Sequence, residues 1–311
     1  MCTVRQYLLR LGIALAVLWG EFSGAQGLEG PGFAVDYDSV EFRMTQVAGR
    51  VHMLAGAGGN LGVFVADDGV FLVDGQFAPL TERILAEIGR VSHQPVRFLI
   101  NTHFHGDHTG GNDNFGRAGT IIVAHENVRR TLAQPHYIEM VQTRWPAFAP
   151  TALPVITFSN AVSFNQGGER IDVIHAPPSH TDGDSLIYFR GSDVIHMGDI
   201  FRTRGQPIFD RNNGGSYEGL IAASDFVLDL IGENTKIVPG HGAVSTRADL
   251  LEVRNIMATV RDRIQADIDA GRTVEEIVAS DPSAGFNWRD GRLTVAETVR
   301  WIHAELLAKS R

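Results

Sequence analysis

The sequence predicts a layered α/β protein. Three observations predict this class: a series of short β-type runs, a helical segment among them, and amphipathic helices at the end of the chain. The β-type runs that open the pattern lie at 51–54, 61–66 and 70–73, separated by Gly-rich and Asp-Asp-Gly turns. The helical segment, 81–91, carries apolar residues on one face, and the strand 96–100 follows it.

Beyond residue 100 the sequence continues with both kinds of element. Strands are predicted at 120–123, 155–158, 170–175, 186–189 and 194–196, and helices at 126–132 and 216–231. Three helices of the C-terminal part begin with a capping-box pattern, at Thr246, Thr273 and Thr294. Because amphipathic helices bury their apolar face, we expect these helices to cover a sheet as outer layers.

Residues 134–154 differ from their surroundings. Four prolines are spaced among Trp145 and Phe148, and proline interrupts both helices and strands. We expect an irregular segment here. It is either a surface excursion packed on its own aromatic side chains or a lid over a substrate site.

Composition restricts the function. The chain has 311 residues, of which 44% are hydrophobic and 20% charged, enough for one large core or two modest ones. Its formal net charge of −9 disfavours a polyanionic partner. We therefore expect a small-molecule substrate and no nucleic acid, while the sequence leaves the oligomeric state open.

The N-terminus is typical of a secretory signal. Arg5 and Arg10 precede the apolar segment 11–19, and the small residues 23–25 offer a cleavage point before Gln26. The apolar segment is too short to stay in a bilayer as a helix, so we expect a secreted or periplasmic protein without a stable membrane span; an uncleaved anchor is the alternative.

The signal prediction also divides the chain. We expect a signal peptide over residues 1–25, a linker over 26–44, and a single domain with a helical C-terminal part over 45–311. Cleavage removes Cys2, the only cysteine, so the exported protein has no disulfide.

Potential metal ligands are concentrated in the stretch 101–111, directly after a predicted strand. His103, His105, Asp107 and His108 fall within six residues. Because strand side chains alternate, the residues at steps of two are expected to leave the strand end on one side, with His108 following as the chain bends. This arrangement fills two adjacent metal positions. Imidazole and carboxylate donors suit two Zn(II) ions, and Fe(II) or Mn(II) fit the same donors.

This stretch resembles the H-x-H-x-D-H signature of the metallo-β-lactamase superfamily, and Thr102 with Gly110-Gly111 resembles that family's fuller motif. The resemblance covers residues from about 45 to 245. It implies a four-layer αββα sandwich with the metals at one edge of the two sheets.

The resemblance also implies the remaining ligands. His180 matches the histidine that completes the first metal site, while His175 competes for this role but still belongs to a strand. Asp199, in a Gly-Asp pair, resembles the carboxylate that bridges the two metals, and His241 resembles the last ligand of the second site. The implied set is His103, His105, Asp107, His108, His180, Asp199 and His241. We expect structural or surface roles for the other histidines, His52, His93, His125, His136, His196 and His303.

Candidate substrate contacts follow Asp199. Arg202 and Arg204 fall where β-lactamases place a cation that binds a carboxylate. Asn212 and Asn213 fall where they place an amide that polarises a carbonyl; otherwise these residues form a solvated turn.

These assignments predict an exported dinuclear zinc hydrolase that attacks an amide, lactone or ester carbonyl with a metal-bound hydroxide, with β-lactams among the candidate substrates. Asp107 is expected to orient the nucleophile and carry its proton. Two divalent ions against two carboxylates favour an anionic or carbonyl-containing substrate. The alternatives are a mononuclear Fe(II) sulfur dioxygenase using His103, His180 and Asp199, a glyoxalase II-like thioesterase, and a non-catalytic metal-binding protein.

Overall fold

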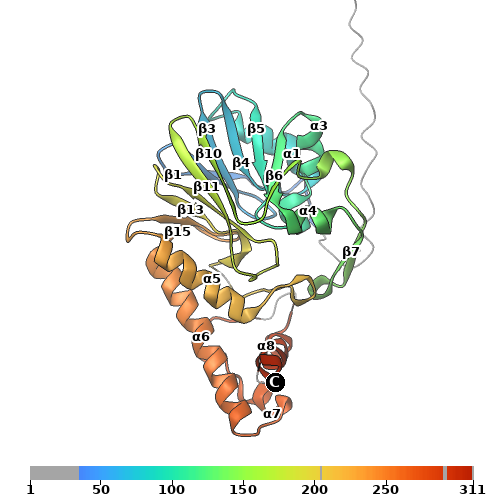
Figure 1. Cartoon of the computed structure of the whole chain (residues 1–311), viewed down its shortest axis with the longest axis vertical. Coiled ribbons are helices and arrows are strands. Elements are labelled where there is room, and N and C mark those ends of the chain that lie inside the picture. Colours follow the sequence, from blue (N-terminus) through green and yellow to red (C-terminus); the bar gives the residue numbers. More distant parts are fainter. Residues whose placement is uncertain (1–34, 204, 290–292, 310–311) are drawn as a thin grey trace, which may run out of the picture.

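The computed structural model describes residues 35–203, 205–289 and 293–309 (Figure 1). The predicted signal peptide, 1–25, and residues 26–34 of the predicted linker lie outside the described residues. The described end of that linker is packed, because Val35, Tyr37, Val40 and Phe42 lie against a core cluster of the first sheet. Within the described part of the chain, every helix is too short or too polar to cross a membrane.

The first sheet has seven strands, in the order β1-β2-β3-β4-β5-β6-β9. Strands β1 to β4 form an antiparallel meander, in which β2, β3 and β4 match the predicted runs and β1 was not predicted. Strands β4, β5, β6 and β9 then run parallel to one another. The strands are β1 (Arg43–Ala48), β2 (Val51–Ala55), β3 (Leu61–Ala66), β4 (Gly69–Val73), β5 (Val96–Ile100), β6 (Ile121–His125) and β9 (Ile156–Phe158).

The second sheet has six strands, in chain order from β10 to β15. Neighbouring strands are antiparallel except β13 and β14, which are parallel and are connected through helix α5 (Tyr217–Leu230). The strands are β10 (Ala161–Gln166), β11 (Glu169–His175), β12 (Ser185–Phe189), β13 (Val194–His196), β14 (Lys236–Val238) and β15 (Ser245–Thr246).

Apolar side chains hold these sheets face to face. Phe64 and Phe71 of the first sheet meet Phe189 of the second, with ring centroids 5.9 and 6.1 Å apart. The outer face of the first sheet packs on α1 (Thr81–Ile88), through Ile84 and Ile88. The outer face of the second packs on α5 and α6 (Arg247–Asp269). Helices on both outer faces and two sheets between them confirm the predicted four-layer αββα class (Figure 1).

The capping predictions are also confirmed. Thr246 and Thr273 form capping boxes at the starts of α6 and α7 (Val274–Ser280), and Thr294 exchanges hydrogen bonds with Glu297 at α8 (Val295–Lys309). The expectation that all these helices cover a sheet is wrong for α7 and α8. Helix α6 has 23 residues and is about 35 Å long, so it runs past the sheet, and α7 and α8 lie beside its far part (Figure 1).

Candidate metal centre

The ends of several strands meet at one edge of the sandwich. Asp74 follows β4, the stretch 101–108 follows β5, Asp199 follows β13, and His241 follows β14. Backbone hydrogen bonds fix the two sheets to each other at this edge, since the Asn60 amide donates to the carbonyl of Gly240, 2.7 Å away. The order of the strands therefore brings residues far apart in the sequence into one place.

The stretch after β5 is shaped by a turn and a short helix. Strand β5 ends at Ile100, so His103 and His105 lie in the turn, and Asp107 and His108 lie on α2 (Gly106–Thr109). The expectation that strand alternation aligns these side chains is therefore wrong. Adjacent residues of a helix point about 100° apart, and this lets Asp107 and His108 approach their partners from different directions.

Three buried histidines form the first cluster. His103 Nε2 lies 3.1 Å from His105 Nδ1, which lies 2.9 Å from His180 Nε2. His180 belongs to the loop after β11, and its backbone N–H donates to the carboxylate of Asp184. None of the three residues is more than 4% exposed. The sequence-predicted residues of the first site are thus brought together.

The other ring nitrogen of each histidine decides which nitrogen carries the proton. His105 Nε2 faces the Asp210 carboxylate at 3.0 Å, and His180 Nδ1 faces the Ile208 carbonyl at 2.8 Å; both oxygens only accept, so both nitrogens carry hydrogen. His103 Nδ1 faces the hydroxyl of Thr102 at 3.0 Å, which itself donates to Asp74. In the neutral rings, three lone pairs therefore point at one another, an arrangement that a shared cation satisfies.

The second cluster contains one carboxylate and two histidines. Asp107 Oδ2 lies 3.7 Å from His108 Nε2 and 3.4 Å from His241 Nε2. His108 donates through Nδ1 to Asp74, 2.7 Å away, so its Nε2 is free to face the cluster. Asp107 is 13% and His241 26% exposed, so this cluster is the more open of the two.

Asp199 lies between the clusters. Its Oδ2 is 3.8 Å from His180 Nε2 and 3.3 Å from His241 Nε2, and its Oδ1 is 3.2 Å from His108 Nε2. Although Asp199 Oδ1 and His108 Nε2 are buried and close, neither makes a hydrogen bond of normal geometry. Buried polar atoms without partners are costly, and a cation between them would remove that cost.

The electrostatics agree with this donor set. Burial and the neighbouring His108, His180 and His105 lower the pKa of His103, and burial and His105 lower that of His180. In the second cluster burial lowers the pKa values of the histidines, but the neighbouring carboxylates outweigh it. Asp107, Asp74 and Asp199 raise the pKa of His108 well above its usual value. Asp199 and Asp107 raise the pKa of His241 to about 9. The carboxylates thus attract positive charge to this edge.

Sequence comparison decides the family. The profile of the metallo-beta-lactamase superfamily matches residues 55–255. The chain belongs to the metallo-β-lactamase superfamily. Members are mostly metal-dependent hydrolases, which supports an enzyme of this type with a small-molecule substrate.

Solved structures show the same fold. A metallo-beta-lactamase from Pontibacter korlensis has 18% identity and a TM-score of 0.59, covering 70% of this chain and 99% of that one. The DIM-1 metallo-beta-lactamase has 18% identity and a TM-score of 0.57, covering 71% and 99%. A stereoselective inverting sec-alkylsulfatase from Pseudomonas sp. has 16% identity and a TM-score of 0.64, covering 86% of this chain and 50% of that one. At these identities the likeness shows the fold alone.

His175 and His196 lie outside the two clusters. His175, the competitor of His180, stacks on His125 with ring centroids 3.7 Å apart, and its Nε2 bonds to the Asp182 carbonyl. His196 is held by the Asn60 carbonyl and the Gly198 amide. Neither His175 nor His196 is part of the clusters of potential metal ligands among the described residues.

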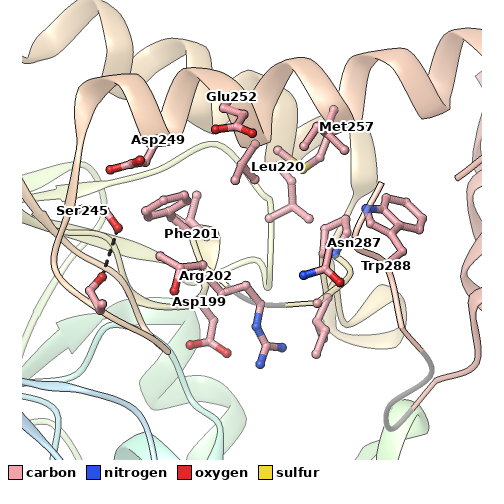
Figure 2. Close-up of a pocket in the computed structure, with 18 of the residues that line it drawn as sticks. Asp199, Phe201, Arg202, Leu220, Ser245, Asp249, Glu252, Met257, Asn287 and Trp288 are labelled. Atoms are coloured by element: carbon pink, nitrogen blue, oxygen red, sulfur yellow. Dashed lines mark hydrogen bonds between the residues drawn. The ribbon is translucent and has the colours of Figure 1, made fainter. Parts of the chain in front are cut away.

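Of the predicted substrate contacts, the structure places Arg202 at a cavity beside Asp199. Arg202 and Asp199 line the same cavity (Figure 2), whereas Arg204 lies outside the described residues. Asn212 is exposed, and Asn213 donates to Asp210 and to the Tyr137 carbonyl. Asn213 therefore supports Asp210 in this structure and does not present a free amide to a substrate.

The segment 134–154 contains more regular structure than expected. Its strands β7 (His136–Ile138) and β8 (Thr143–Trp145) form a hairpin. Trp145 is 9% exposed, and its ring packs so closely on Gly106 that a Cβ there would collide with it. The hairpin thus covers the loop that carries the first histidines.

Two residues of the site were missed by sequence reasoning. Asp74 is fully buried at φ +63°, a left-handed conformation, and binds both Thr102 and His108. Its place directly after a predicted strand was the available signal. Asp210, which orients His105, is 105 residues away from it in the chain, and no local pattern marks it. Close packing also supports the ligands, because a Cβ on Gly59 would overlap the His108 ring and one on Gly240 would overlap Asp199.

Proposed function

We propose that this protein is a dinuclear zinc hydrolase that cleaves an amide, lactone or ester carbonyl. In this proposal His103, His105 and His180 would hold the first ion. Asp107, His108 and His241 would hold the second, and Asp199, between the clusters, would contribute its carboxylate to both. The observation that carries the proposal is the set of donor atoms that face one another in the two clusters. In His105, His180 and His108 the other ring nitrogen is hydrogen-bonded to a neighbouring group, which leaves the inward nitrogen for a metal. Fe(II) or Mn(II) would fit the same donors.

Two zinc ions would supply Lewis acidity and lower the pKa of water to about 7. The protein's own residues would organise the reaction around them. Asp107, the carboxylate of the more open cluster, would orient the attacking water and take its proton. Asp210, Asp74 and the Ile208 carbonyl would hold the imidazoles in the tautomers that leave the inward nitrogens free.

The charge of the site selects the substrate. Two divalent ions exceed the charge of Asp107 and Asp199, so an anionic or polarised carbonyl compound is favoured. Arg202 would bind an anionic group beside the ions. We also propose that residues 1–25 direct export and are removed, which argues against cytoplasmic substrates such as glutathione thioesters.

Metal analysis and a substrate panel test the proposal. Protein purified without added metal should contain about two zinc ions per chain. It should hydrolyse at least one of a chromogenic β-lactam, a simple lactone and a nitrophenyl ester. His180→Ala should lose the first zinc ion and most of the activity.

Other results of the same experiments contradict the proposal. One iron per chain with sulfur oxygenation would establish the dioxygenase instead, and activity confined to thioesters would establish the thioesterase. A protein that keeps two metals but hydrolyses none of these compounds would not be this hydrolase.

A further inference from the structure

A cavity of about 450 Å³ adjoins the metal centre on the side of the second sheet. It lies between the segment 199–208 and helix α6 (Figure 2). Its size falls within the range of small-molecule sites in proteins. The apolar part of its wall includes Phe201, Leu220, Val253, Ile256, Met257 and Trp288.

Two charged groups, those of Asp199 and Arg202, lie at one end of this cavity. In Figure 2 the carboxylate of Asp199 and the guanidinium of Arg202 point the same way, away from α6, whereas Leu220, Met257 and Trp288 lie on the other side. Asp199 also belongs to the metal centre, so this end of the cavity is the reacting end. The apolar side chains line the part of the cavity on the other side of these two charged groups.

Arg202 lacks a partner at this end. Its side chain is half-buried, and no carboxylate in the described part of the chain forms an ion pair with it. Its Nε is buried within the protein, so a ligand would meet the other nitrogens of the guanidinium. An anionic group of the ligand would pair with the guanidinium there.

The far rim of the cavity is acidic. Asp249 and Glu252 of α6 line it. Asp249 accepts from Thr246 in the capping box, and Glu252 is exposed. A second anion at this end would be repelled, so the ligand that fits carries one anionic group near Arg202 and an uncharged apolar remainder.

We propose that this cavity binds the apolar part of the substrate, so that the substrate is an amphiphilic carbonyl compound. An alkyl or aryl group would fill the space below α6, and a single anionic group would pair with Arg202 beside the ions. This inference rests on the proposed hydrolase function and names the substrate class of that site.

Binding of fatty-acid anions tests the inference without relying on turnover. Butanoate, hexanoate and octanoate are titrated into the zinc-loaded full chain by calorimetry. Burial of each added methylene should raise the affinity by about fourfold until the cavity is full. Affinities that do not change with chain length would overturn the inference.

Matched variants locate the site. Val253→Phe narrows the cavity and should reduce the ratio of octanoate to butanoate affinity. Leu251→Phe is the control, because Leu251 lies on the same helix, is 40% exposed and does not line the cavity. Equal ratios in the two variants would contradict the assignment. If Val253→Phe does not fold, the chain-length series of the unmodified protein decides the question.

The charge component has its own readout. Arg202→Gln should weaken octanoate binding about tenfold or more and leave the binding of neutral octanamide nearly unchanged. Equal weakening of both compounds would overturn the role of Arg202. Chain-length-dependent binding in a protein that hydrolyses no carbonyl compound would support the cavity assignment and refute the hydrolase proposal, so the two failures are distinguishable.

Discussion

Asp74→Asn is a sharp test of the proposed centre, because it changes one atom behind the ligands and none of the ligands. Asp74 is fully buried and has a φ of +63°. Asparagine tolerates this left-handed conformation and has nearly the same shape, so the backbone should be kept. The essential change is that one acceptor oxygen becomes an NH₂ group.

The magnitude follows from the three hydrogen bonds that Asp74 accepts. They come from the Thr102 amide and hydroxyl, both at 2.8 Å, and from His108 Nδ1 at 2.7 Å. The carboxamide has one oxygen, so in either orientation its NH₂ faces a former donor. An unpaired buried donor costs about 1–3 kcal/mol. If the NH₂ faces His108, the ring is favoured in the tautomer with its proton on Nε2, the atom that faces the second cluster.

We therefore expect the zinc affinity of Asp74→Asn to fall by about 10- to 100-fold. Competition with a chromogenic chelator measures this loss, and thermal unfolding of the metal-free protein measures the stability. Asp67→Asn is the matched control, because Asp67 is 88% exposed and pairs only with Arg50 in the nearby turn. Zinc affinities of Asp74→Asn and Asp67→Asn within about twofold of each other would refute the role given to Asp74.

The remaining predictions are these. His180→Ala should remove the first metal and most turnover, whereas His175→Ala should leave both metals bound; equal metal loss would reverse this assignment. Asp199→Asn should keep the fold and weaken the second metal selectively, with activity partly restored by added zinc; unchanged occupancy and rate would mean that Asp199 bridges nothing. For Asp172, burial raises the pKa, but hydrogen bonds from a serine and two arginines lower it from 3.8 to about 2. Because folding depresses this pKa, the ionised carboxylate stabilises the fold above about pH 4, and this stabilisation is lost as the pH falls towards 2. Asp172→Asn should therefore lower the free energy of unfolding by at most about 2 kcal/mol at pH 7 and by much less at pH 2.5, as measured by urea unfolding. N-terminal sequencing of exported protein should begin near Gln26, and recovery of the uncleaved chain from membranes would show an anchor instead.

The sequence predicted several of the potential metal ligands that the structure brings together, because these residues form a short-range pattern. The spacing of His103, His105, Asp107 and His108 is visible within six residues, and the pattern survives even though its assumed cause, strand alternation, is wrong. Family resemblance then predicted the more distant candidates, His180, Asp199 and His241, which also fall in these groups of potential ligands.

The supporting residues could not be predicted in this way. The contact between Asp210 and His105 exists only because the loop before α5 folds back over the turn after β5. A single sequence contains no signal for such a contact. The hairpin of residues 134–154 was hidden for another reason, since its two strands have three residues each and lie among prolines that favour irregular structure.

The division of the centre between the two sheets has a consequence for assembly. Residues 103–108 follow a strand of the first sheet, whereas His180, Asp199 and His241 follow strands of the second. Neither half of the chain holds a complete donor set, so two bound ions would join the halves as cross-links do. The free energy of metal binding would then stabilise only the chain in which the two sheets are correctly packed. A chelator would therefore destabilise the sandwich as well as stop the reaction. Because the sequence has a single cysteine, it cannot form an internal disulfide, and metal binding would act as the last step of folding.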